Sequence, residues 1–199
     1  MENKIKENKN KFINLLLSTN REGIKDLVEF MENETDFFEA PASTKYHLSC
    51  EGGLLEHSLN VYNNLVKEIS LDMLDESEEF KESMIIVSLL HDLCKANYYS
   101  VSEKNVKNEK GVWVKEPYYI VDDTFPLGHG EKSVILIQNF IYLTPLEILA
   151  IRWHMGGYEP KDNYTYLGKA FNKCYLALAL HIADLKATYI DENEEIKKC

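Results

Sequence analysis

Apolar residues recur at intervals of three and four along almost the whole chain, and this periodicity sets the strongest limit on the fold. Because such spacing gathers apolar side chains on one face of a helix, it predicts an all-α protein. Thr144-Pro145 gives the clearest start signal, an N-cap followed by proline at the first helical position, and Ser133 gives a weaker one. The expected helices cover residues 4–18, 22–34, 54–70, 78–98, 130–142, 145–155 and 168–190.

One segment departs from helical spacing. Residues 101–121 place valines and aromatic residues on both sides of a polar Asn-Glu-Lys-Gly turn, which predicts a small β-hairpin inserted into the helical fold. Pro117 has no backbone donor, so it restricts this segment to an edge strand or a broken strand.

Length and composition favour one domain over residues 1–199, with N-terminal helices over 1–34 and a core over 35–190. The 199 residues are 45% hydrophobic, which suits a sizeable core. No apolar run is long enough to cross a bilayer, and the charged N-terminus has no secretory apolar core. We therefore expect a cytoplasmic protein without a membrane partner. The four cysteines form no CxxC pair, which favours reduced thiols over a disulfide framework or a zinc-thiolate site.

Net charge limits the partners further. With 22 basic and 33 acidic residues the chain carries −11 at pH 7, and this field repels long polyanions such as duplex DNA. A small phosphorylated ligand stays compatible with that charge if a local cationic site attracts it. The sequence leaves the oligomeric state open. The C-terminal run DENEEIKK is expected to be a solvated, fraying helix end.

Polar side chains interrupt the apolar helical stretches at a small set of positions. Burying such groups without partners costs several kcal/mol, so they point either to a metal site or to a hydrogen-bonded core network. Imidazoles together with carboxylates are typical ligands of Mn, Fe, Co, Ni or Zn, whereas Mg and Ca prefer oxygen. The candidate metal ligands are His57, His91, Asp92, His129, His154 and Asp184.

Asp92 and Lys95 are the candidate catalytic residues. Neighbouring helical residues project about 100° apart, so His91 and Asp92 can reach different sides of one site. The two carboxylate oxygens of Asp92 allow it to bridge two metals. Lys95 lies one turn later on the same helical face, where its cation can bind a phosphoryl oxygen or stabilise a leaving group. Pairing of Lys95 with an acidic neighbour is the alternative.

This ordered set resembles the HD superfamily of metal-dependent phosphohydrolases in its six-ligand, two-metal form. The segments FFEAPASTKYHLSCEGGLLEHSLNV, LLHDLCK, GHGEKS and LHIAD are most similar to the HD domain of bacterial 3′-to-5′ exoribonucleases, over about residues 35 to 190. The chain departs from that pattern at Leu48, where the family has a second histidine, and at Cys94, where it has glycine.

The resemblance implies an all-helical HD bundle that binds two divalent ions, drawn from Mn, Fe, Co, Ni and Mg, or a single such ion. It also implies that a hydroxide between two metals attacks phosphorus. The ligands implied for the first metal are His57, His91, Asp92 and Asp184, and those for the second are His129, His154 and a bridging Asp92.

The candidate substrate-binding residues are His47, Lys95 and Arg152. His47 is included because of its position in the resembling family, and a loop histidine without a role is the alternative. Arg152 lies two residues before His154, so the two do not share a helical face, and a structural salt bridge is the alternative. His181 lies one turn before Asp184 and is expected either to orient a ligand or to fill the core.

Five aromatic residues in and beside the hairpin complete the candidates. They are expected either to stack on a base beside the site or to pack the hairpin against the helices. They are Tyr98, Tyr99, Trp113, Tyr118 and Tyr119.

Together these patterns predict a metal-dependent phosphohydrolase or phosphodiesterase that acts on a nucleotide or a short oligonucleotide. One alternative is a 3′-to-5′ exonuclease acting on RNA or single-stranded DNA. A second is a non-catalytic module that binds a nucleotide and signals to a partner.

Overall fold

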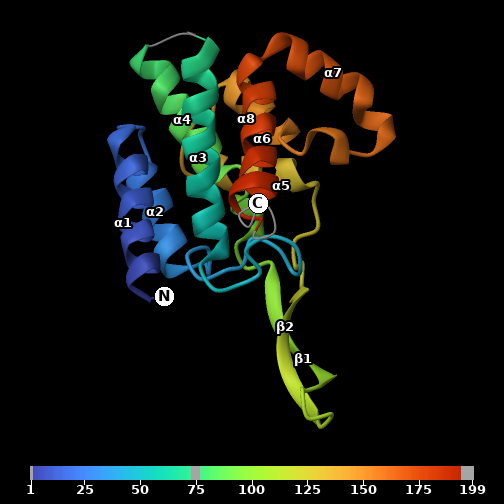
Figure 1. The fold of residues 1–199 in the computed structure, drawn as a ribbon. Helices are drawn as coiled ribbons and strands as arrows, with labels where there is room; N and C mark the ends of the chain where they lie inside the picture. Colours follow the sequence, from blue (N-terminus) through green and yellow to red (C-terminus); the bar gives the residue numbers. More distant parts are fainter. Residues whose placement is uncertain (1, 73–76, 194–199) are drawn as a thin grey trace.

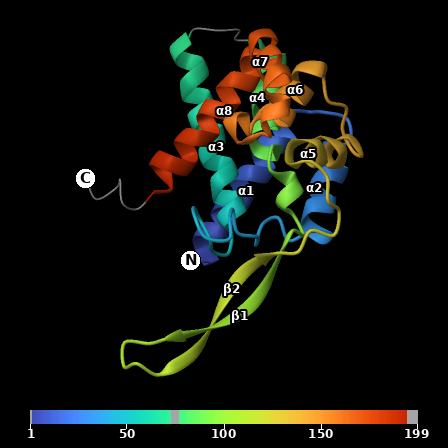
Figure 2. The same cartoon turned by 90° about the vertical axis from the view of Figure 1, so that its right-hand side faces the viewer.

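A computed structural model of the chain describes residues 2–72 and 77–193. Its helices pack side by side into a bundle, and a two-stranded antiparallel hairpin projects from one end of that bundle (Figures 1 and 2). The prediction of an all-helical fold with a small hairpin is confirmed. No helix within the described ranges is long and apolar enough to cross a membrane.

The helices begin and end close to the positions that the periodicity predicts, with exceptions given below. The helices are α1 (Glu2–Ser18), α2 (Ile24–Asn33), α3 (Gly53–Asp72), α4 (Glu78–Leu90), α5 (His129–Gln138), α6 (Pro145–Trp153), α7 (Tyr164–Lys173) and α8 (Tyr175–Lys186). Short 3-10 turns cover Leu93–Lys95, Gly156–Tyr158 and Lys161–Asn163, and a π-helical turn covers Ala187–Asp191. The strands are β1 (Tyr99–Lys107) and β2 (Trp113–Val121).

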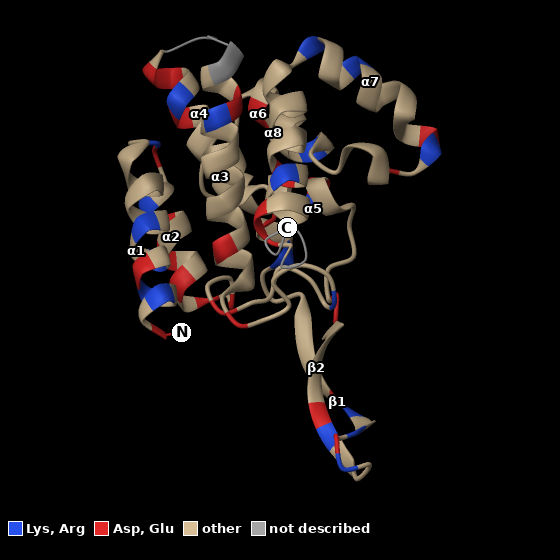
Figure 3. Cartoon of the chain, in the orientation of Figure 1, with Lys and Arg blue, Asp and Glu red and all other residues tan. Residues whose placement is uncertain are grey.

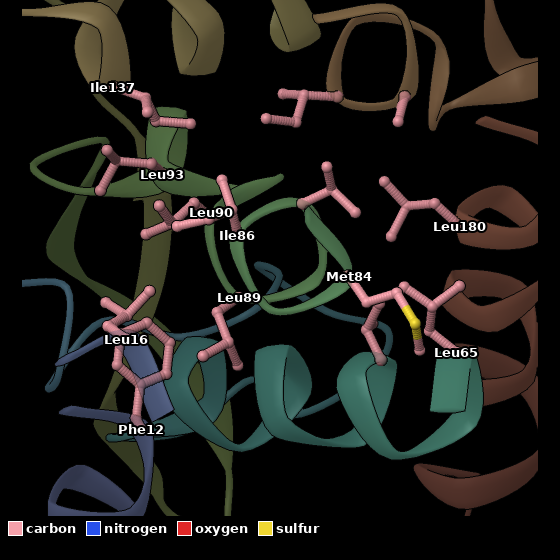
Figure 4. Packing of buried hydrophobic residues seen from close by; sticks show 14 of the residues in the cluster. Phe12, Leu16, Leu65, Met84, Ile86, Leu89, Leu90, Leu93, Ile137 and Leu180 are labelled. Carbon is pink, nitrogen blue, oxygen red and sulfur yellow. The ribbon is translucent and has the colours of Figure 1, made fainter. Parts of the chain in front are cut away.

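The hydrophobic core lies where α3, α4, α6 and α8 pack together, with α1 and α2 against one side. Figure 4 shows apolar side chains of α1, α3, α4 and α8 interlocking, among them Phe12, Leu65, Leu89 and Leu180. Each of these four side chains is fully buried, because the apolar face of each helix is covered by a neighbour.

The predicted helix over 78–98 is wrong beyond residue 90. Helix α4 ends at Leu90, the chain leaves helical geometry at Asp92, and Asn97 takes a positive φ of 52° before β1. At this helix end His91 donates from Nδ1 to the Ser88 carbonyl at 2.8 Å, so a side chain satisfies an acceptor at the helix end. The interruption turns His91 and Asp92 into the interior.

The predicted helix over 168–190 is two helices. Cys174 separates α7 from α8 in an extended conformation (φ −131°, ψ 97°), although neither glycine nor proline marks the break. Its buried thiol lies 3.5 Å from the Leu146 carbonyl, so packing against α6 accompanies the break. Cys94 is also buried, Cys50 is exposed, and all three thiols are free.

The start signals at Thr144 and Ser133 have different outcomes. Thr144 caps α6 in a complete capping box: its hydroxyl accepts from the Glu147 backbone and its own backbone donates to the Glu147 carboxylate. Ser133 lies inside α5, which begins at His129 after Gly128, so the start signal at Ser133 is wrong. Its hydroxyl instead accepts from the Cys94 backbone N–H at 3.0 Å.

The Glu147 carboxylate is fully buried at the joint between three elements. Arg21, in the turn before α2, lies 2.7 Å from it and also pairs with Glu82 of α4 at 3.1 Å. Ser83 of α4 donates a further hydrogen bond to Glu147 at 2.7 Å. The charge is therefore compensated on several sides, as a buried carboxylate requires.

The hairpin pairs Tyr99 with Val121 at its base and Lys107 with Trp113 at its far end. Asn108 closes the turn by accepting from the backbone of Lys110 and Val112, and Gly111 supplies a φ of 74°. Both strands are edge strands, which is where Pro117 is tolerated.

The C-terminal segment differs from the solvated end that the charge run predicts. After α8 the chain continues into the π-helical turn, and Glu192 is buried against α3. The prediction is wrong for Glu192. Residues 194–198 of the run lie outside the described residues.

Candidate metal centre

Six polar side chains from five helical elements meet in the interior. His57 comes from α3, His91 and Asp92 follow α4, His129 opens α5, His154 follows α6, and Asp184 lies on α8. Three overlapping groups each have donor atoms within 4.8 Å of one another. These groups are His57, His91 and Asp92; His91, His154 and Asp184; and Asp92, His129 and His154.

Asp92 lies at the centre, and its two oxygens face different residues. Oδ1 lies 2.7 Å from His129 Nε2 and 3.6 Å from His154 Nε2. Oδ2 lies 3.5 Å from His91 Nε2 and 3.6 Å from His57 Nε2. One carboxylate thus lies between two sets of imidazoles, and this geometry allows it to contact two cations at once.

His91 and His154 are held by the same local device. Each is the C-cap residue of its helix, and each donates from Nδ1 to the carbonyl three residues earlier, Ser88 at 2.8 Å and Ile151 at 2.6 Å. Because Nδ1 carries the proton in these bonds, Nε2 is the free ring nitrogen in the neutral tautomer. Both Nε2 atoms are buried and have no hydrogen-bond partner.

These unpaired nitrogens test whether the residues fit a metal. Burial lowers the pKa of His91 to about 4, so the ring is neutral at pH 7 and turns a lone pair toward the Asp92 carboxylate. Two electron-rich atoms facing each other in the interior are favourable when a cation lies between them. The donor set of imidazole nitrogens and carboxylate oxygens therefore fits a divalent transition metal.

His57 is held by a residue that sequence reasoning missed. Its Nε2 lies 3.3 Å from Asp184, and its Nδ1 lies 3.0 Å from the buried Glu192 carboxylate. Burial opposes the charged form of His57, but the hydrogen bonds with Asp184 and Glu192 outweigh it and raise its pKa to about 10. Asn60 donates to Glu192 at 3.0 Å, and Asn64 donates to Asp191 at 2.6 Å.

One sequence signal could have found Glu192. His57, Asn60 and Asn64 recur at helical spacing along one face of α3, so they form a polar stripe on a largely buried helix. Buried polar side chains need polar partners, and here Asp191 and Glu192 provide them.

Lys95 lies at the edge of the cluster. Its ammonium is 2.7 Å from Asp92 Oδ2 and is mostly buried. Burial opposes the charge of Lys95, but the Asp92 carboxylate outweighs it, so the pKa of Lys95 is raised. The structure thus gives Lys95 the acidic neighbour that the alternative interpretation proposed, and that neighbour is itself a candidate ligand.

The more accessible side of the cluster is formed by His129, whose side chain is 28% exposed. The Cys94 thiol lies 3.3 Å from its Nδ1. Burial raises the pKa of Cys94 to about 12, so the thiol is neutral and acts as a weak hydrogen-bonding neighbour of His129.

The remaining candidates lie at different distances from the cluster. The His47 ring is 5.0 Å from the His57 ring, and its Nε2 is buried without a hydrogen-bond partner. Arg152 instead pairs with Glu131 at 2.6 Å and Glu159 at 2.8 Å, so the structure gives it the salt bridges of the alternative interpretation. Its role in substrate binding stays a prediction.

His181 contacts the backbone behind a candidate ligand. Its Nδ1 donates to the His154 carbonyl at 2.7 Å, and its ring stacks on Phe171 with centroids 5.7 Å apart. Gly156 lies so close that an added Cβ would be 2.2 Å from the His181 ring. His181 therefore holds the chain around His154 in place.

The aromatic candidates do not form one wall. Tyr98 and Tyr99 pack edge to face, and the Tyr99 hydroxyl donates to the Ala42 carbonyl at 3.3 Å. Trp113 lies at the far end of the hairpin and is 64% exposed, with Lys107 5.2 Å from its ring centroid. Packing of the hairpin base explains the first two residues, and Trp113 takes no part in it.

Comparison with known proteins identifies a distant relative. The chain is 31% identical over 129 residues to the dihydroneopterin 2′,3′-cyclic phosphate phosphodiesterase of Methanocaldococcus jannaschii. The match covers 61% of this chain and 44% of the relative, so this chain spans less than half of the relative's length. No protein-family model matches the chain, and no solved structure matches it.

Proposed function

We propose that this protein is a metal-dependent phosphodiesterase of the HD type, which hydrolyses a phosphate ester of a nucleotide or a short oligonucleotide. The observation that supports it best is Asp92, whose two oxygens face two separate sets of imidazoles. Each set contains one buried Nε2 atom without a hydrogen-bond partner, that of His91 in one and that of His154 in the other. The distant relative acts on a cyclic phosphate diester, which supports the same class of reaction here.

The residues would divide the work as follows. Two bound divalent cations would supply Lewis acidity and lower the pKa of water. Asp92 would hold both ions, and Lys95 would neutralise a phosphoryl oxygen on the substrate. His57, His91 and Asp184 would complete the first ligand set, and His129 and His154 the second.

The substrate is expected to be small. A net charge of −11 repels long polyanions, whereas cations at the cluster would attract one compact phosphate group. The relative's cyclic substrate is of this compact kind.

The test is hydrolysis by the purified protein with added Mn, Fe, Co, Ni or Mg. The panel contains bis(p-nitrophenyl) phosphate, 2′,3′-cyclic and 3′,5′-cyclic adenosine monophosphate, adenosine monophosphate and a labelled oligonucleotide. We expect metal-dependent turnover of at least one small ester. Asp92→Ala should lower the turnover by more than about a hundredfold, because loss of a residue that only hydrogen-bonds to a metal ligand already lowers metal affinity or activity by about 10 to 100-fold.

The exposed Asp162→Asn is the matched control and should leave turnover unchanged. Laddered degradation of the oligonucleotide would favour the exonuclease alternative. If calorimetry detects nucleotide binding but no substrate gives a product, the result would favour the non-catalytic module over the enzyme.

A further inference from the structure

A pocket of about 420 Å³ opens between the base of the hairpin and the loop over residues 43–50, and none of the candidate metal ligands lines it. We call it the hairpin pocket. Its volume suits a nucleoside-sized group. Its polar and aromatic lining comes from Thr44, Lys45, Ser49, Lys104, Tyr118 and Tyr119.

The hairpin pocket is cationic in an acidic protein. It contains Lys45 and Lys104, and none of its lining residues is a carboxylate, although the chain as a whole carries −11. Lys45 is exposed and forms no ion pair with any residue in the described ranges. The Lys104 ammonium lies 5.5 Å from the Tyr118 ring centroid, so a cation–π contact holds it in place.

A neighbouring pocket provides an internal contrast. It has a volume of about 260 Å³ and shares Val101 and Tyr119 with the hairpin pocket, but it is also lined by Asp36, Glu39 and Glu51. An anion is repelled there and attracted by the two lysines of the hairpin pocket. Charge therefore favours the hairpin pocket over the neighbouring pocket as the site for an anionic ligand.

The hairpin pocket is tied to the candidate metal centre through one loop. Lys45 and Ser49 flank His47, whose ring lies 5.0 Å from that of His57. Internal hydrogen bonds hold this loop: Ser43 donates to the His47 carbonyl at 2.8 Å, and the Ala42 N–H donates to the Leu48 carbonyl at 3.1 Å. Tyr99 then attaches the hairpin base to the same loop through Ala42.

We propose that the hairpin pocket binds the part of the substrate that lies beyond the scissile phosphate. An aromatic base packs against Tyr119, and a second phosphoryl group pairs with Lys45 and Lys104. This inference rests on the proposed function, because it takes the metal centre as the place of the reacting phosphate. The substrate class is then a short nucleotide that carries one phosphoryl group besides the scissile one.

The rest of the hairpin limits the length of this ligand. Acidic and basic residues are mixed along the hairpin (Figure 3): Glu116 lies opposite Lys104 in the register, and Glu103 pairs with Lys115 at 2.7 Å. Such a surface offers no continuous basic track for a long strand. The two lysines of the hairpin pocket are therefore the anion-binding part of the hairpin.

The test is calorimetric binding without metal, in EDTA, so that no turnover occurs. The probes are 5′-phosphorylated diadenylate (pApA) and the same dinucleotide without its 5′ phosphate (ApA). We expect pApA to bind about tenfold more tightly than ApA, as two partly exposed ion pairs would give. Lys45→Ala combined with Lys104→Ala should bind both probes equally.

Two further variants separate the parts of the proposal. Lys107→Ala removes a lysine that also lies over an aromatic ring of the hairpin but outside the pocket, and it should leave both affinities unchanged. Tyr119→Leu should weaken pApA and ApA by the same factor, because stacking does not depend on the phosphate. Thermal melts check that each variant is folded.

The proposal is overturned if wild-type protein does not prefer pApA, or if the preference survives in the double lysine variant. It is also overturned if Lys107→Ala removes the preference equally. Hydrolysis is measured separately. If the double variant loses the pApA preference but the wild-type protein hydrolyses no ester, the pocket is supported and only the proposed function is rejected. If the wild-type protein and the double lysine variant hydrolyse bis(p-nitrophenyl) phosphate equally and the wild-type protein does not prefer pApA, only the pocket is rejected.

Discussion

At the scale of single residues, the orientation of each imidazole is decided by the partner of its other nitrogen. His91 and His154 use a backbone carbonyl of their own helix, whereas His57 uses the Glu192 carboxylate. A carboxylate is the stronger partner, because it makes the imidazole more basic as well as orienting it. Glu192 should therefore matter for the metal affinity of the candidate centre as well as for packing.

Replacing Glu192 by glutamine tests this contribution. The Glu192→Gln side chain keeps its size and an acceptor oxygen but loses its charge, so the affinity for Mn should fall by about 10 to 100-fold while the fold persists. Titration calorimetry with Mn measures the change, and circular dichroism checks folding. Asp191→Asn is the control from the same turn, because Asp191 pairs with Asn64 and not with a candidate ligand. Equal losses in both variants would contradict a specific role for Glu192.

The clustering of the six candidate ligands could be predicted because most of them are polar residues in an apolar helical context. Glu192 could not be singled out in the same way, since it lies in a run of similar acidic residues. Only its position against His57 and Asn60 distinguishes it from them. For Arg152 the sequence left two partners open, a phosphate or a carboxylate. The structure pairs it with two carboxylates, and its role in substrate binding stays a prediction.

At the scale of elements, the joint of α2, α4 and α6 depends on one buried carboxylate. Glu147→Ala removes one of the two carboxylate partners of Arg21, the acceptor of Ser83 and half of the capping box. We expect it to lower the free energy of unfolding by about 3 kcal/mol. Thr144→Ala removes only the cap and should cost about 1 kcal/mol. Urea denaturation of both variants measures the difference. If Glu147→Ala lowers the free energy of unfolding no more than Thr144→Ala does, the contacts of Glu147 with Arg21 and Ser83 do not stabilise the fold.

The far half of the hairpin should be dispensable for the bundle. Lys104 and Glu116 face each other in the register, so an Asn-Gly turn can replace residues 105–115. Because that half is exposed, the melting temperature should change by no more than about 2 °C. Differential scanning calorimetry checks this, and a fall of more than about 5 °C would show that the far half stabilises the helices.

Element types were easier to predict than element ends. Periodicity identified the helices, and the turn residues identified the hairpin, because both signals are local. The end of α4 and the break at Cys174 depend on tertiary contacts, namely the burial of Asp92 and the packing of Cys174 against α6. No glycine or proline announces either one.

At the scale of the whole molecule, the candidate ligands connect α3, α5 and α8 with the ends of α4 and α6, so a bound ion would brace most of the bundle. Ions at 100 times their dissociation constant stabilise the native state by about 2.7 kcal/mol. Mn should therefore raise the melting temperature and EDTA should reverse the rise, as measured by differential scanning fluorimetry. Asp92→Asn should abolish the rise. A rise of equal size in that variant would place the effect at another site.

His57 and the carboxylate that orients it are separated by 135 positions in the chain. During translation His57 leaves the ribosome early, while Asp184 and Glu192 emerge only with the last described helix and the turn after it. A copy that ends before Asp184 therefore lacks one candidate ligand, and a copy that ends before Glu192 lacks the partner of another. Under the proposed function, such fragments would bind transition metal more weakly than the full chain and would therefore hydrolyse nucleotides less readily.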